Sequence, residues 1–171
     1  RNKILILPIL NKYIMRIFTH FIALLLGFLM GIYILPILTA PKSIDLSTLQ
    51  ESMKNSEYQA NFEKNLKGSD FAHWGEGTIS ISNDRITHIG KISPGPDYKL
   101  YLLPTYADDE ASFNKIKADS LFISDIKNFD GFIVTIPPSV DVTNYNSILI
   151  WCEAFGQFIT SAQYRYTEKV K

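Results

Sequence analysis

The first 40 residues form one long apolar segment that differs from everything after it. Residues 21–38 carry no charge, and residues 17–40 add only His20, Thr19 and Thr39 as polar side chains. About 20 apolar residues, rising 1.5 Å each, cover the roughly 30 Å hydrocarbon core of a bilayer. The pattern therefore predicts a transmembrane helix over residues 17–40. A cleaved signal peptide is the alternative, but Pro41 directly after the only alanine of a cleavage-like sequence disfavours it.

The next segment has apolar residues at roughly helical spacing. Asp45 or Ser47 is a suitable N-cap, and Gly68 is a suitable C-terminal cap. Between them, Leu, Met, Tyr and Phe side chains recur about every three or four residues. We therefore expect residues 41–69 to form a helical stalk that holds the rest of the chain away from the membrane.

From residue 70 onward the pattern changes to short runs rich in Ile, Val, Thr, Tyr and Phe, separated by turn residues. A polar stretch, residues 108–117, interrupts them and is expected to form a helical turn on the surface. Frequent turns between short alternating runs are typical of an antiparallel β-sandwich or barrel. The sequence thus predicts a mainly β domain over residues 70–171, with strands at 78–82, 85–92, 98–103, 120–126, 131–136, 147–152 and 157–166.

Charge gives the apolar segment an orientation. The formal net charge is zero, yet residues 1–40 hold four basic side chains and no acid, while every Asp and Glu follows Pro41. Basic residues beside the first span stay in the cytoplasm. We therefore expect a cytoplasmic segment over residues 1–16, a single-pass anchor in the cell membrane, and a C-terminal domain that is periplasmic or extracellular. Met15 is a more ordinary start residue than Arg1, so residues 1–14 are expected to be an over-extended reading of the gene.

Several common chemistries have no motif here. The chain lacks a Cys-x-x-Cys pair, a haem-attachment signature, a glycine-rich phosphate loop and a Gly-x-Ser-x-Gly elbow. The acidic cluster at residues 108–110 lacks the ligand spacing of a calcium loop. The outer domain also holds more acids than bases, which disfavours nucleic acid as a partner. These absences disfavour a hydrolase or a transferase.

Four residues remain as candidates for a site, and the first is Cys152, the only cysteine. A lone cysteine is either a small buried hydrophobe or a reactive thiol. Outside the cytoplasm a spare thiol is a liability, which favours a role for it. Trp151, its neighbour, is expected to shape the pocket of the cysteine, and His73 or His88 of the outer domain is expected to complete the site. Thiolate and imidazole together suit haem iron or copper, although a histidine on an apolar strand face is also typical of a core residue.

Three segments of the outer domain form a recognisable pattern. They are His73 ahead of Gly-Thr-Ile-Ser-Ile at 77–81, the run Gly-Pro-Asp-Tyr-Lys-Leu-Tyr-Leu at 95–102, and Asn-Tyr-Asn-Ser-Ile-Leu-Ile-Trp-Cys-Glu-Ala-Phe at 144–155. This pattern resembles the DM-thirteen (DM13) family of predicted electron-transfer domains. The resemblance covers about residues 70–165. It implies a sandwich similar to DOMON domains, with Cys152 as the redox or ligand residue. The longer, polar segment at 107–126 departs from the common pattern and leaves the partner open.

Two functions follow as hypotheses. The first is a membrane-anchored electron-transfer or cofactor-binding domain in which Cys152 exchanges electrons or acts as a ligand, with haem or copper as the candidate cofactor and a redox or assembly protein as partner. The second is a non-catalytic surface-binding module in which Cys152 only fills the core and exposed aromatic side chains, Trp74, Tyr98, Tyr101 and Tyr106, make the contacts. Gly27 and Gly31 match the small-xxx-small pattern of helix dimers, so a homodimer through the anchor is also expected.

Overall fold

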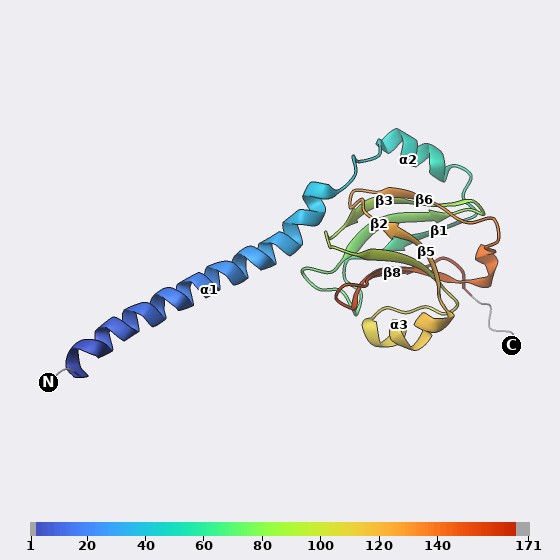
Figure 1. Cartoon of the computed structure of the whole chain (residues 1–171). Coiled ribbons are helices and arrows are strands. Elements are labelled where there is room, and N and C mark those ends of the chain that lie inside the picture. Colours follow the sequence, from blue (N-terminus) through green and yellow to red (C-terminus); the bar gives the residue numbers. More distant parts are fainter. Residues whose placement is uncertain (1–2, 167–171) are drawn as a thin grey trace.

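A long helix leads to a compact β domain at one end of the chain (Figure 1). The computed structural model describes residues 3–166, with side chains from residue 11 onward. Helix α1 spans Lys3–Thr39, and its stretch Asn11–Thr39 is long and apolar enough to cross a membrane. A signal sequence would have the same properties. The expectations for Arg1, and for residues 167–171 of the outer domain, fall outside the described residues.

The two glycines of the expected dimer motif lie on the exposed surface of α1. A Cβ built on Gly27 or on Gly31 meets no atom within 4 Å. The helix therefore offers a flat strip at these positions, and the homodimer stays a prediction.

The domain is a sandwich of two four-stranded antiparallel sheets, and it is not a closed barrel. The first sheet has the order β1-β2-β3-β6 and the second has the order β5-β4-β7-β8. This confirms the predicted mainly β fold. The strands are β1 Tyr58–Phe62, β2 Gly75–Ile81, β3 Arg85–Ile92, β4 Tyr98–Leu103, β5 Leu121–Ile126, β6 Phe132–Thr135, β7 Ser147–Cys152 and β8 Gln157–Gln163.

The prediction that residues 41–69 form one helical stalk is largely wrong. Helix α2 covers only Leu46–Met53, and Tyr58–Phe62 is a strand paired with β2. Helix α2 also packs on the sandwich, because Leu49 is buried and Ser52 Oγ lies 2.7 Å from Thr87 Oγ1 on β3. The segment is therefore part of the domain and does not hold it away from the anchor.

A helix covers each outer face of the sandwich, so the layers run α2, first sheet, second sheet, α3 (Figure 1). Helix α3, Glu110–Ile116, falls within the polar stretch that predicted a helical turn. Asp109 accepts a 2.7 Å hydrogen bond from the backbone amide of Ser112, which forms a capping box at its start. Phe113 on this helix is fully buried against the second sheet.

The strands bury two separate apolar clusters. The larger cluster lies between the sheets, and alternate residues of β7, Ile148, Ile150 and Cys152, belong to it. On the other face of β7, Leu149 and Trp151 belong to the smaller cluster beneath α3. All six residues of β7 are buried, which is why its sequence is almost continuously apolar.

Candidate functional site

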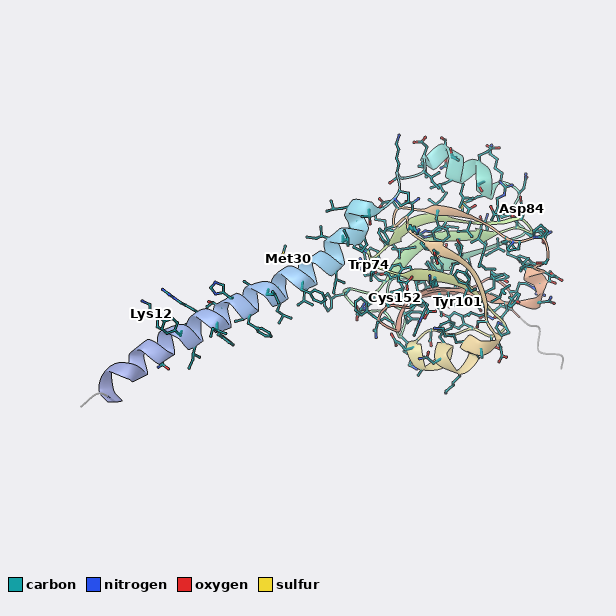
Figure 2. The ribbon with its side chains drawn as sticks, viewed as in Figure 1. Lys12, Met30, Trp74, Asp84, Tyr101 and Cys152 are labelled. Carbon is teal, nitrogen blue, oxygen red and sulfur yellow. The ribbon has the colours of Figure 1, made fainter. Side chains whose placement is uncertain are left out.

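The end of the sandwich that faces α1 gathers segments that are far apart in the sequence. Cross-strand register places Tyr98 opposite Cys152, and Cys152 opposite Gln157, at this end. Gly75 lies opposite Ile92 where β2 begins and β3 ends. The segments 69–74, 93–97 and 153–156 therefore meet here, and we call this the anchor-facing end. Trp74 and Cys152 lie on this side of the domain in Figure 2.

A small pocket lies among these segments, and Cys152 lines it. Its volume is about 100 Å³. Cys152 and Tyr98 come from paired strands, and Phe155 comes from the turn after β7. The remaining lining comes from two loops and from α1, namely Ala72, His73, Pro94, Gly95, Pro96, Ile32 and Tyr33. The structure thus brings His73 and Cys152, which are distant in the sequence, to one cavity.

Burial controls the chemistry of the Cys152 thiol. The residue is 1% exposed and belongs to the core between the sheets. Burial raises the pKa of the thiol, because the thiolate loses hydration. Backbone amides of Phe155, Asp97 and Ala154 oppose this shift without cancelling it. At neutral pH the sulfur is therefore protonated, which makes it a weak nucleophile until a cation or a base favours the thiolate.

His73 is held by a carboxylate beside the pocket. Its Nδ1 lies 3.0 Å from Asp70 Oδ2, and Asp70 Oδ1 accepts hydrogen bonds of 2.7 Å from the backbone amides of Ala72 and His73. Burial raises the pKa of Asp70, but the hydrogen bonds from His73 and from these amides outweigh it and lower that pKa overall. The ionised carboxylate can only accept, so Nδ1 of His73 donates to it. A carboxylate that orients an imidazole in this way is typical of ligand and proton-accepting histidines.

Trp151 and His88 do not line this pocket. The Trp151 side chain lies on the opposite face of β7, where its ring centroid is 4.9 Å from that of Phe113 in α3. Strand alternation explains this, since adjacent residues point to opposite faces. The expectation that Trp151 shapes the same pocket as Cys152 is therefore not met.

His88 is a core residue of the first sheet. It is fully buried between Phe62 and Phe132, with ring centroids 5.3 and 5.2 Å away. Its Nε2 donates to the Glu76 carbonyl at 3.1 Å, and Nδ1 has no hydrogen-bond partner among the described residues. Burial lowers its pKa to about 4. A Cβ on Gly90 would lie only 2.8 Å from Nε2, so the glycine makes room for the ring.

The aromatic surface expected for a binding module is also different from the prediction. Tyr98 is buried between the sheets and Tyr101 is buried beneath α3. Trp74 is half-buried, with Lys64 Nζ 4.1 Å from its ring centroid. The aromatic side chains that are exposed in the domain are Phe71, Phe122, Phe155 and Tyr166.

Sequence reasoning missed a polar cluster next to Trp151. Glu153 accepts hydrogen bonds from Tyr101 Oη at 2.5 Å and from Lys117 Nζ at 2.7 Å. The Lys117 ammonium also lies 5.2 Å from the Trp151 ring centroid. These residues come from β4, the turn after β7 and the segment after α3, so no local motif could have indicated them.

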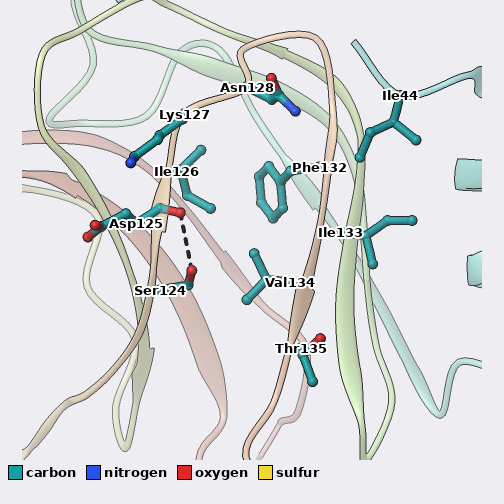
Figure 3. Close-up of a pocket in the computed structure, with 10 residues that line it drawn as sticks. All are labelled: Ile44, Ser124, Asp125, Ile126, Lys127, Asn128, Phe132, Ile133, Val134 and Thr135. Carbon is teal, nitrogen blue, oxygen red and sulfur yellow. Dashed lines mark hydrogen bonds between the residues drawn. The ribbon is translucent and has the colours of Figure 1, made fainter. Parts of the chain in front are cut away.

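A hollow elsewhere on the domain carries less chemistry. A hollow of about 420 Å³ lies between β5 and β6, the free edges of the two sheets, with Ile126, Phe132 and Val134 on its walls (Figure 3). Its polar groups are surface side chains and backbone, such as Ser124 Oγ, which donates to the Asp125 carbonyl at 3.2 Å. Neither a thiol nor an imidazole lines it.

The pocket residues do not make a complete haem or copper site. A cavity of about 100 Å³ is smaller than the roughly 300 Å³ at which small-molecule pockets begin, so it cannot enclose a haem. Copper electron-transfer sites use two histidines and one cysteine. The lining of this cavity holds one histidine, His73, and one cysteine, Cys152. Among the described residues, no group of three or more His, Cys, Asp or Glu side chains could hold a metal ion.

These features define a two-sheet sandwich with a buried thiol at a small pocket, and comparison places it in a family. A family model described as Electron transfer DM13 matches residues 61–164, which include the whole sandwich except the start of β1. The chain therefore belongs to the DM13 electron-transfer family. No curated protein and no solved structure matches it significantly.

Proposed function

We propose that this chain is a membrane-anchored electron-transfer domain whose redox site is the pocket of Cys152 and His73. One observation carries the proposal, which is that the single cysteine of a DM13 domain lines a cavity together with a carboxylate-oriented histidine. Residues 17–40 would hold the domain at the membrane, outside the cytoplasm, as the basic residues before them favour.

The two side chains would have different roles. Cys152 would contact the redox-active group of a cofactor or partner, as an electron-exchanging residue or as a ligand. Because the cavity is small, only an edge of a larger group would enter it. His73 lines the same cavity and Asp70 holds its ring, so it would be the group placed to exchange a proton with the thiol.

The direct test is to purify the full chain from membranes in mild detergent and to record its absorption spectrum and metal content. We expect the wild type to retain a redox-active group that Cys152→Ser and Cys152→Ala both lose. Phe122→Leu, an exposed change on β5, is the matched control and should retain the group.

The opposite outcome is equally clear. A colourless, metal-free wild type whose thiol reacts with alkylating reagents only after unfolding would make Cys152 a packing residue. The binding-module hypothesis would then be favoured, with the hollow between β5 and β6 as its first candidate surface. A stable membrane partner recovered equally by the wild type and by Cys152→Ala would support that alternative.

A further inference from the structure

The last two turns of α1 lie against the anchor-facing end of the sandwich. Ile32, Pro36 and Ala40, spaced by four residues, are partly covered, whereas most of their neighbours on α1 are exposed. Ile32 lines the Cys152 pocket, and Pro36 and Ala40 line a second hollow with Gly95, Pro96 and Phe129. The helix therefore runs along these loops before it ends.

This contact fixes the depth of the loops relative to a bilayer. The last charged residue of α1 is Arg16, so the apolar stretch begins at Ile17. About 20 residues span the hydrocarbon core, which brings its outer boundary near Pro36. Ile32 then lies about 6 Å inside that boundary, at 1.5 Å per residue. Loops that contact Ile32 and Pro36 must therefore reach the surface of the membrane.

Two phenylalanines on these loops are exposed. Phe71 is 96% exposed on the segment before His73, and Phe155 is 52% exposed in the turn after Cys152. Tyr33 of α1, next to the same pocket, is also exposed. Exposed aromatic side chains gathered at one end of a domain are typical of an interaction surface, and aromatic residues concentrate at membrane interfaces.

The charged groups at this end suit the headgroup layer. Its three acids are paired: Asp70 with His73, Asp97 with Lys99 and Glu153 with Lys117. Nearby, Lys127 and Asp130 are exposed in the loop between β5 and β6. Charged groups at headgroup depth keep their hydration, and a lysine there is attracted to lipid phosphates. Insertion is therefore limited to the tips that carry Phe71 and Phe155.

We propose that the anchor-facing end rests on the outer leaflet of the bilayer that α1 spans, with Phe71 and Phe155 inserted at the boundary between headgroups and acyl chains. The Cys152 pocket then opens toward lipid, and the molecule that reaches it is apolar, is dissolved in the membrane and enters the cavity by one edge. The inference rests on the anchor of the proposed function, and it does not depend on a redox role for Cys152.

The test uses the full chain with Cys152→Ala, so that single cysteines introduced at exposed positions can carry a fluorescent label. Phe71→Cys and Phe155→Cys report on the anchor-facing end. Tyr166→Cys is the matched control, because Tyr166 is an 80% exposed aromatic residue that follows β8 at the opposite end. Each protein is reconstituted into phosphatidylcholine vesicles, and the label is quenched with nitroxide lipids or with aqueous iodide.

We expect lipid quenching at positions 71 and 155 to exceed that at 166 several-fold, and iodide quenching to show the reverse order. If the protein floats with the vesicles but all three labels are quenched equally, the inference is overturned and the anchor is not. Protein that does not float with the vesicles would overturn the anchor and the inference together.

A second measurement avoids the Cys152→Ala background. In vesicles containing the unaltered chain, a lipid-soluble maleimide should modify Cys152 faster than a charged maleimide, after each rate is divided by its rate with free cysteine. Equal normalised rates would contradict a pocket that opens toward lipid.

Discussion

At the residue scale, the environment of Cys152 decides how the thiol can react. Burial raises its pKa, so the folded state binds the thiol proton more tightly than the unfolded chain does. The contribution of this thiol to the free energy of unfolding is therefore fully present below the ordinary thiol pKa, near 8.5, and is lost as the pH rises above it. We expect alkylation of the native chain to begin at a higher pH than alkylation of the same chain in denaturant, as measured by the rate of iodoacetamide labelling against pH.

An exposed cysteine provides the comparison for this experiment. Phe122→Cys in a Cys152→Ala background places a thiol on the surface of β5. Its labelling profile should be the same in the native and the unfolded chain. If native Cys152 gave that same profile, the burial that we assign to its sulfur would be contradicted.

His88 gives a second prediction at this scale, and here stability falls as the pH decreases. Burial lowers its pKa to about 4 from an ordinary 6.5, so the unfolded chain binds the proton more readily between these values. Stability should be fully present above pH 6.5 and should fall by about 3 kcal/mol as pH drops to 4. Urea unfolding of the wild type and of His88→Leu measures this, because the variant should lose that part of the pH dependence.

A core substitution on the same strand separates this effect from packing. Ile86→Val removes one buried methyl group on the strand face that His88 shares. It should lower the free energy of unfolding by about 1 kcal/mol at every pH and leave its dependence on pH unchanged. If the free energy of unfolding of His88→Leu depended on pH as that of the wild type does, the acid sensitivity would come from other groups.

At the scale of elements, helix α2 is part of the folded domain. Leu49 is 2% exposed, whereas Leu46 on the same helix is 56% exposed. Leu49→Ala should therefore cost roughly 2–5 kcal/mol of stability and Leu46→Ala should cost almost nothing. Denaturant unfolding of the two variants measures the difference. Equal, small effects would restore the picture of a stalk that is independent of the sandwich.

The sequence pattern predicted most strands because they alternate between two covered faces or end at turn residues. The bounds of three strands, Arg85–Ile92, Tyr98–Leu103 and Ser147–Cys152, agree with the prediction. Strand β1 was missed because its inward residues Tyr58 and Phe62 are four apart, a spacing that fits both a helix face and a strand face. Pairing with β2, which local sequence does not show, decides between them.

At the scale of the whole molecule, we expect the proposed orientation in the membrane to depend on a few basic side chains. Lys12 and Arg16 precede the apolar stretch and should stay in the cytoplasm. A C-terminal alkaline phosphatase fusion, which is active only outside the cytoplasm, should therefore be active. The double variant Lys12→Glu, Arg16→Glu should reduce that activity at equal protein amount. High activity of a cytoplasmic reporter on the wild-type chain would contradict the orientation.

The candidate site could be predicted only in part. Cys152 and His73 stood out as residue types that bind cofactors, but their shared pocket depends on the register of β4 with β7 and on the loop before β2. Trp151 was assigned to the pocket because it adjoins Cys152 in the sequence, although strand alternation places adjacent residues on opposite faces. The contribution of α1 to the pocket is long-range and has no sequence signal.

A redox titration of the full chain purified from membranes, comparing the wild type with Cys152→Ala and Phe122→Leu, tests the central claim most directly. We predict a reversible oxidation and reduction in the wild type and in Phe122→Leu that is absent from Cys152→Ala. A titration that is the same in all three proteins, or the absence of any redox change in the wild type, would contradict the assignment of Cys152 as the redox residue.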